Sequence, residues 1–247
     1  MALIQHWFYS KALTECSCLY VVIPVERHPK KTYPVLWLLP PAGYDHTAWQ
    51  RRADVEQIAE REGVMAVMPD LKLSYGLDMA YGFSYFQMLT EELPKLVETY
   101  FPADPGHQMI AGAGEGAYGA MMAALRCPRQ YRQVIALSGG CLTRERFAGR
   151  ERRQIEHAFG TGEPSSLAGT RYALEYWLEK NEYGDLRVSL AYGREDRCAA
   201  GAGNLEKALK RAEGIELKAA VYEHALGWRE WKSLLSEFVK NCGEGKE

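Results

Sequence analysis

Short apolar runs alternate with amphipathic segments along most of the chain, which predicts an α/β fold with a mainly parallel sheet. The continuous apolar runs are typical of strands that are buried on both faces. Such strands are expected at 35–39, 64–68, 109–111, 134–137 and 186–192. Helical spacing of apolar residues predicts helices at 54–62, 85–100, 117–125, 170–180, 204–213 and 232–240, with Pro94 kinking or breaking the second of them.

The two ends of the chain extend this pattern. Residues 3–9 and 17–25 are rich in aromatic and β-branched residues and are joined by a polar connection, so they predict an antiparallel hairpin. A further strand is expected at 215–222. Together the elements predict one doubly wound α/β domain over residues 1–247, with helices on both faces of the sheet. Residues 143–185, which carry a basic patch, are interpreted as a solvated excursion between sheet elements.

The overall composition is that of a globular protein and excludes few functions. The 30 basic residues nearly balance the 32 acidic ones, so no field of one sign indicates a nucleic-acid partner. Residues 1–14 lack the charged and apolar regions of a signal peptide, and no apolar run approaches the roughly 18 residues needed to span a bilayer. The expectation is therefore a cytoplasmic protein without a membrane partner.

Six cysteines are scattered along the chain, and only Cys16 and Cys18 lie close together. In a strand this spacing places both thiols on one face. No C-x-x-C motif and no histidine at zinc-ligand spacing accompanies the pair. We therefore expect reduced, structural thiols, with no metal site and no cofactor.

The most informative stretch is 109–120, where an apolar run leads into closely spaced glycines and then into a helix of small residues. This order of strand, sharp turn and helix is the setting of a nucleophile elbow, G-x-S-x-G, in which the serine occupies a strained turn. Residues 112–116 read G-A-G-E-G, so Gly114 stands at the serine position. Glycine adopts the dihedral angles of such a turn freely.

Further segments surround the elbow in a recognisable order. They are Tyr-Pro-Val-Leu-Trp-Leu-Leu (33–39), Val-Met-Pro-Asp (67–70), Glu-Glu-Leu-Pro (91–94), Tyr-Phe-Pro (100–102), Ala-Leu-Ser-Gly (136–139), Gly-x-x-Asp (193–196) and Trp-x-x-Trp (228–231). In these segments the chain resembles the esterase D and tributyrin esterase family of α/β-hydrolases over nearly its whole length. The resemblance implies an α/β-hydrolase fold and hydrolysis of short-chain carboxylic esters by a Ser-Asp-His triad.

The same resemblance assigns the triad positions, and two of them carry residues that cannot do the chemistry. Gly114, at the nucleophile position, has no side chain that could form an acyl-enzyme. Leu226 stands two residues before the tryptophan pair, where the family has histidine. Asp196 matches the acid, although turn chemistry at a strand end explains it equally well. His224 is an alternative base at a shifted position, or an ordinary loop histidine.

The loop that supplies oxyanion donors in the family, usually His-Gly after two leucines, is Pro40-Pro41-Ala42 in this chain. Pro41 lacks an N–H and has a fixed φ, so the loop is expected to follow another path. The N–H groups of Ala42 and Glu115 remain as candidate donors. The carboxylate of Glu115, at the start of the elbow helix, favours the helix but opposes a developing oxyanion.

These departures favour a catalytically degenerate esterase that keeps its cleft to bind a small acyl or aromatic ligand or a protein partner. Aromatic candidates for the pocket, which are also common packing residues, are Tyr75, Tyr81, Phe83, Trp228 and Trp231. Two alternatives stay open. One is an active short-chain ester hydrolase in which Glu115, Asp196 and His224 act as acid/base groups around a water molecule. The other is an inactive structural or regulatory subunit of an esterase oligomer, and the sequence is also compatible with a homo-oligomer.

Overall fold

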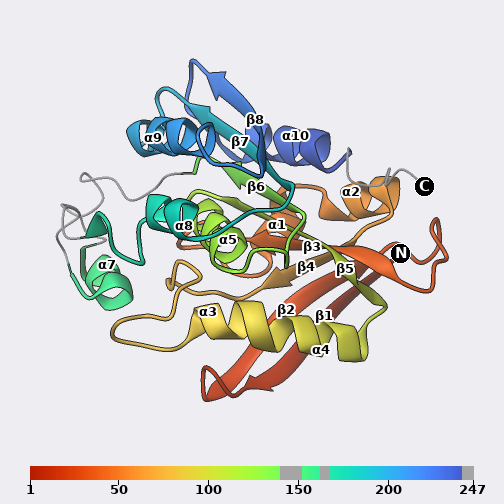
Figure 1. Cartoon of the computed structure of the whole chain (residues 1–247). Helices are drawn as coiled ribbons and strands as arrows, with labels where there is room; N and C mark the ends of the chain where they lie inside the picture. The colour runs from red at the N-terminus through yellow and green to blue at the C-terminus, as the bar shows by residue number, and fades with distance from the viewer. Residues whose placement is uncertain (140–151, 162–166, 241–247) are drawn as a thin grey trace.

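The computed structural model describes residues 1–139, 152–161 and 167–240. In this part of the chain the strands form one eight-stranded sheet with the order β1-β2-β4-β3-β5-β6-β7-β8 (Figure 1). The strands are β1 (Ala2–Ser10), β2 (Glu15–Ile23), β3 (Tyr33–Leu39), β4 (Met65–Pro69), β5 (Ala103–Ala113), β6 (Gln133–Leu137), β7 (Leu186–Gly193) and β8 (Ile215–Tyr222). The pairs β1–β2 and β2–β4 are antiparallel, and all other neighbours are parallel. The predicted α/β-hydrolase fold with an antiparallel N-terminal hairpin is confirmed.

Helices cover both faces of this sheet, as expected. They are α1 (Ala48–Arg52), α2 (Val55–Glu62), α3 (Tyr85–Gln87), the π-helix η1 (Met88–Glu92), α4 (Leu93–Tyr100), α5 (Glu115–Arg126), α7 (Arg152–Phe159), α8 (Leu174–Lys180), α9 (Ala199–Leu209) and α10 (Trp228–Val239). Among the residues that the structure describes, no helix has the length and apolar character of a membrane span.

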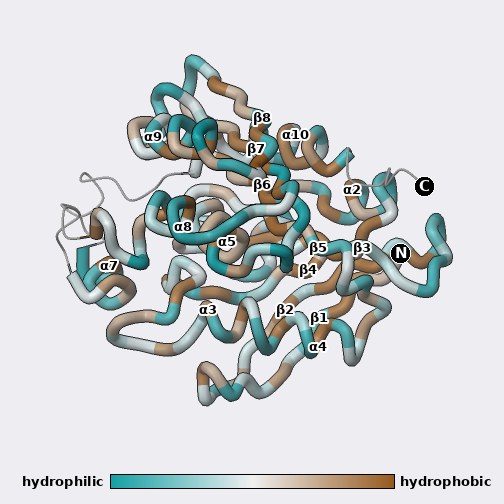
Figure 2. Tube along the Cα trace, viewed as in Figure 1, coloured by the Kyte–Doolittle hydropathy of each residue, from teal (hydrophilic) through white to brown (hydrophobic). Residues whose placement is uncertain are grey.

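Alternate residues of the central strands enter two apolar clusters on opposite faces of the sheet. In β3, Val35, Trp37 and Leu39 contribute to the cluster beneath α3, α4, α5, α8 and α9, whereas Leu36 and Leu38 contribute to the cluster beneath α1, α2 and α10. Figure 2 shows the hydrophobic colour concentrated along these central strands. This double burial explains why the strands appear in the sequence as continuous apolar runs.

The segment expected as one helix at 85–100 is divided by the π-helix η1, which ends just before Pro94. Proline cannot donate to the carbonyl four residues earlier, which is that of Thr90. The side-chain amide Nε2 of Gln130 donates to this carbonyl oxygen at 3.1 Å. The helix is therefore not broken at Pro94: a π-helical turn replaces the α-helical one before it, and the Thr90 carbonyl accepts from another segment.

Two helix boundaries differ from the sequence-based expectation. The last helix begins at Trp228 and not at 232, because the N–H of Gly227 donates to the Glu230 carboxylate (3.0 Å) and starts the helix there. Both tryptophans therefore lie in a helix and not in the expected loop. α9 occupies 199–209 in place of 204–213, since its glycine-containing start obscured the helical pattern.

The excursion expected at 143–185 contains α7 and α8, while residues 143–151 and 162–166 lie outside the described residues. Three of the arginines of the predicted basic patch, Arg144, Arg146 and Arg150, therefore also lie outside the described residues.

Candidate functional site

The turn between β5 and α5 has the geometry of a nucleophile elbow, with Gly114 at its apex. Gly114 has φ 56° and ψ −118°, a combination that residues with a side chain adopt only under strain. Its N–H donates to the Leu137 carbonyl at the end of β6 (2.9 Å), and its own carbonyl accepts from the N–H of Tyr118 (3.3 Å). The backbone of the turn is thus fixed on both sides although its apex carries no side chain.

The other two glycines of the motif allow strand, helix and loop to approach closely. A Cβ atom on Gly112 would lie 2.2 Å from the backbone of Gly116, and one on Gly116 would lie 2.3 Å from the Leu39 carbonyl oxygen. Both distances are far inside van der Waals contact. The glycines therefore bring the loop after β3 against the N-terminus of α5, as the elbow motif requires.

Glu115, the first residue of α5, closes the contact between this helix and the loop after β3. Its side chain is buried, and its Oε2 accepts the backbone N–H of Ala42 at 3.0 Å. A carboxylate is stabilised at this position by the partial positive charge of the helix N-terminus. One of the two expected oxyanion donors, the Ala42 N–H, thus already has an acceptor within the protein, the Glu115 side chain.

Asp196 lies after β7 and joins two loops through backbone hydrogen bonds. One carboxylate oxygen accepts the N–H of Gly193 and the other accepts the N–H of Leu226, both at 2.8 Å. The side chain of Leu226 is 8% exposed and packs in the apolar cluster beneath α2 and α10. The carboxylate thus reaches the backbone of position 226, which itself carries an apolar side chain.

These positions line one pocket of about 270 Å³ at the carboxyl edge of the sheet. Its lining residues are Pro41, Gly114, Glu115, Ser138, Glu195, Asp196, Arg197, Cys198, Ala225, Leu226 and Trp231. The three positions that the family resemblance assigns to the triad are therefore brought together from β5, β7 and the segment before α10. A ligand pocket at this edge is the general arrangement in open α/β sheets.

His224 is placed apart from this lining. Its side chain is exposed, and its ring contacts that of Tyr222 with the centroids 6.0 Å apart. Its carbonyl oxygen lies 2.0 Å from the place that a Cβ of Gly193 would occupy, so the backbone here is tightly packed against the end of β7.

The five aromatic candidates have different environments. Trp231 lines the pocket, and Trp228 packs edge-on against Trp49 with ring centroids 5.2 Å apart. Tyr75 is buried in the core, whereas Tyr81 and Phe83 are 68% and 45% exposed. Only Trp231 is thus in position to touch a ligand in the pocket beside Gly114.

Sequence reasoning missed a small polar group at the end of β6. Ser138 has φ 52°, and its hydroxyl oxygen accepts the Nε1–H of Trp231 at 3.0 Å. The Sγ of Cys198 donates to the Ser138 carbonyl at 3.2 Å. The sequence carried one signal for it: Ser138 directly follows a buried strand. Because the carboxyl ends of neighbouring parallel strands meet at one edge of the sheet, a residue at this position lies near the pocket.

Comparison with known proteins agrees with this fold. A sequence model of the family described as "Putative esterase" matches residues 10–241. An acetyl esterase of Caldicellulosiruptor saccharolyticus is 25% identical over 99% of this chain and 97% of its own length. An S-formylglutathione hydrolase of Paracoccus denitrificans is 31% identical over 47% of this chain and 48% of its own. The chain therefore belongs to this esterase family.

Solved structures show the same fold at lower identity. The substrate-bound structure of FphF, a fluorophosphonate-binding serine hydrolase of Staphylococcus aureus, superposes with a TM-score of 0.86 at 21% identity. The superposition covers 98% of each chain. A likeness of this extent shows that this chain has the α/β-hydrolase fold.

Proposed function

We infer that this chain is a catalytically degenerate esterase that keeps the family's pocket for binding. The observation that carries the proposal is the hydrogen bond from the Ala42 N–H to the Glu115 carboxylate at 3.0 Å. An oxyanion hole works by presenting unoccupied donors to a developing negative charge. Here a carboxyl oxygen of the protein itself takes up the donor that the intermediate would need.

The residues at the other two positions of the resemblance support the same proposal. Gly114 offers no nucleophile, and the apolar side chain of Leu226 can neither take nor return a proton. Loss of one oxyanion donor alone costs about 2.7–4 kcal/mol of transition-state stabilisation in a serine hydrolase. Nucleophile, base and one oxyanion donor are therefore all affected, and of the three triad positions only Asp196 keeps the expected residue type.

The alternative of a rewired hydrolase finds less support in the geometry. Both carboxylate oxygens of Asp196 already accept backbone N–H groups, and Glu115 accepts another. His224 is exposed and does not line the pocket. A general base needs to lie within hydrogen-bond reach of the water that it activates, and this constellation does not bring the three groups to one such point.

The pocket itself is suited to a small ligand. Its volume of about 270 Å³ is just below the range of about 300–1,000 Å³ for ligand sites. Leu226 and Trp231 supply an apolar and an aromatic surface, and side chains of both charges, among them Asp196 and Arg197, line the rest. The apolar and aromatic part of this lining suits a small acyl or aromatic compound.

Stepwise restoration of the nucleophile, the base and the free oxyanion donor tests the proposal. Gly114→Ser and Leu226→His are combined, with and without Glu115→Ala, and each variant is assayed with a fluorophosphonate probe and a short-chain chromogenic ester. We expect no covalent labelling of the wild-type protein, and turnover in the triple variant that exceeds turnover in the double variant, because Glu115→Ala frees the Ala42 N–H. Labelling of the wild-type protein would overturn the proposal, as would equal turnover in the double and triple variants.

A further inference from the structure

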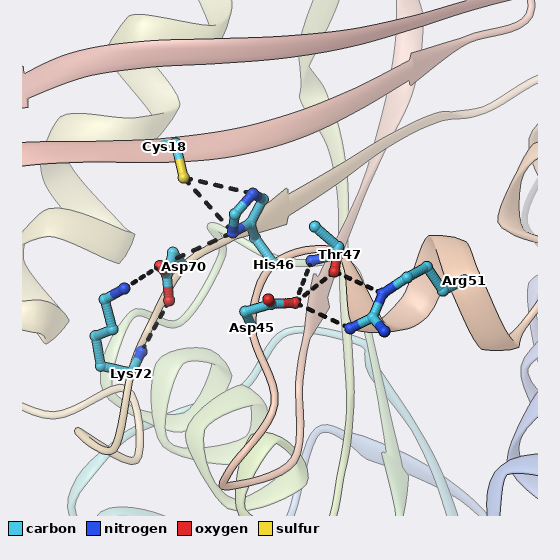
Figure 3. A network of polar contacts seen from close by, with 7 residues as sticks. All are labelled: Cys18, Asp45, His46, Thr47, Arg51, Asp70 and Lys72. Atoms are coloured by element: carbon cyan, nitrogen blue, oxygen red, sulfur yellow. Dashed lines mark hydrogen bonds and ion pairs between the residues drawn. The ribbon is translucent and has the colours of Figure 1, made fainter.

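A second polar cluster lies away from the pocket, where three side chains from separate segments converge (Figure 3). Cys18 belongs to β2, His46 to the loop between β3 and α1, and Asp70 to the segment after β4. All three are largely withdrawn from solvent: Cys18 is 4% exposed, and the side chains of His46 and Asp70 are 11% and 6% exposed. Removing a thiol, an imidazole and a carboxylate from water costs free energy unless these groups find partners.

The register of the sheet brings these groups together. Leu19 pairs with Pro69 in the antiparallel β2–β4 ladder, and the N–H of Asp70 donates to the Cys18 carbonyl at 3.2 Å. The His46 ring packs edge-on against Tyr20 of the same strand, with centroids 4.9 Å apart. Strand pairing and ring packing thus place the three groups side by side, where Cys18 forms a hydrogen bond with His46 and His46 pairs with Asp70 (Figure 3).

The donor atoms lie close enough together to surround one small cation after a small rearrangement. The Cys18 Sγ lies 3.5 Å from the Nδ1 and 3.4 Å from the Nε2 of His46, and this Nδ1 lies 3.8 Å from the Asp70 Oδ2. All the donor atoms lie within 4.8 Å of one another. Metal–ligand bonds of about 2.0–2.3 Å in a tetrahedral zinc site place neighbouring donors roughly 3.3–3.6 Å apart. To reach that geometry the longest separation has to shorten by about 1 Å, and the His46 ring has to turn, because the Sγ now lies almost equally far from its two nitrogens.

We propose that Cys18, His46 and Asp70 form a binding site for a divalent cation of the zinc type. Thiolate, imidazole and carboxylate are the three ligand types that Zn²⁺ takes from proteins. Three protein ligands leave the fourth tetrahedral position to water or to a small ligand. Asp70 also lines a cavity of about 520 Å³ together with Tyr44, Asp45 and Lys72, which gives the site a connection to solvent.

Lys72 is the internal competitor of this cation. Its Nζ lies 2.6 Å from the Asp70 Oδ2, and its backbone N–H donates to the Asp70 Oδ1 at 3.2 Å. A cation that binds Oδ2 has to displace the ammonium group or share the oxygen with it. Because the Lys72 side chain is 63% exposed, moving it into solvent costs little.

The same three residue types also occur in cysteine nucleophile relays, but this environment does not favour a thiolate on its own. Burial, and after it the charge of Asp70, raises the pKa of the Cys18 thiol to about 11. A relay of the papain type has the opposite property, a thiol whose pKa is lowered by its histidine.

A cobalt titration tests the site, because tetrahedral Co²⁺ bound to a thiolate has a charge-transfer band in the near ultraviolet and intense visible bands. The wild-type protein, freed of metal with a chelator and kept reduced, is titrated with Co²⁺, and Zn²⁺ is then added. We expect both bands to appear with one equivalent of Co²⁺ and to disappear with one equivalent of Zn²⁺.

Four variants decide which residues hold the ion. Cys18→Ser and His46→Gln should each weaken binding by at least about 100-fold, since even an outer-shell change costs about 10- to 100-fold. Cys16→Ser, at an exposed cysteine on the same strand, is the matched control and should leave binding unchanged. Lys72→Met removes the competitor and should tighten binding by roughly two- to fivefold.

Circular dichroism of each variant confirms that it is folded, and the two ligand variants serve as independent tests if one of them is not. The proposal is overturned if no charge-transfer band appears at millimolar Co²⁺, or if the band persists in folded Cys18→Ser. It is also overturned if Cys16→Ser removes the band as completely as Cys18→Ser does. None of these readouts depends on ester hydrolysis.

Discussion

Replacing Gly114 with alanine measures the backbone strain of the elbow with almost no contribution from steric clashes. A Cβ on Gly114 would have its nearest neighbour, the Pro41 Cβ, at 3.5 Å, which is an ordinary contact. The cost must then come from the dihedral angles, φ 56° and ψ −118°, and such conformations cost about 1–3 kcal/mol in residues with a side chain. For a chain of this length that corresponds to a fall in Tm of roughly 2–12 °C.

Gly203→Ala is the matched control, because a Cβ there also has its nearest neighbour at 3.5 Å, the Tyr192 hydroxyl. Gly203 lies within α9, where alanine is favoured over glycine by up to about 1 kcal/mol. In urea unfolding, the free energy of unfolding should therefore be lower than that of the wild-type protein for Gly114→Ala and higher for Gly203→Ala. If Gly114→Ala is as stable as the wild type, the elbow is not strained, and the reasoning that glycine relieves it is wrong.

Two further substitutions test how the pocket is held together. Gly116→Ala should lower the free energy of unfolding by about 3 kcal/mol or prevent folding, because its Cβ would lie 2.3 Å from the Leu39 carbonyl oxygen. Thermal unfolding followed by circular dichroism measures this, and an unchanged Tm would show that the loop can move away. Asp196→Ala leaves the N–H groups of Gly193 and Leu226 without their acceptor. It should lower the free energy of unfolding, measured by urea titration, by about 1–3 kcal/mol. Asp196→Asn keeps one acceptor oxygen and should lose about half as much; equal losses would contradict this structural role.

The fold was largely predictable because its strands carry their signal locally. Double burial makes β3, β4 and β6 continuous apolar runs, and the aromatic and β-branched residues of β1 and β2 indicate a hairpin. Helix ends were less predictable. The start of α10 depends on a hydrogen bond from the Gly227 N–H to Glu230, and the sequence pattern of apolar residues does not report such a bond.

The candidate site was predictable in its positions but not in its contacts. The glycine motif located Gly114, and the structure brings it together with Asp196 and Leu226. The bond between Glu115 and the Ala42 N–H joins residues 73 positions apart and depends on how the loop after β3 turns, which no local pattern encodes.

The proposed cation site of Cys18, His46 and Asp70 illustrates the same limit of sequence-based prediction. Cys18 has no histidine at zinc-ligand spacing in the sequence, and its partner His46 lies 28 residues away. Only the register of β2 against β4 and the packing of His46 on Tyr20 bring the donors together. A site assembled from three segments is visible in three dimensions and not in any short motif.

The rate of short-chain ester hydrolysis by the wild-type protein tests the central claim most directly. The purified chain is assayed with a chromogenic acetyl or butyryl ester beside an active esterase of the same family and a buffer blank. We predict a rate equal to that of the blank, because Gly114 offers no nucleophile and the Ala42 N–H is bonded to Glu115. Turnover that co-purifies with the protein and falls in Glu115→Gln or His224→Ala would contradict the account and identify a rewired hydrolase.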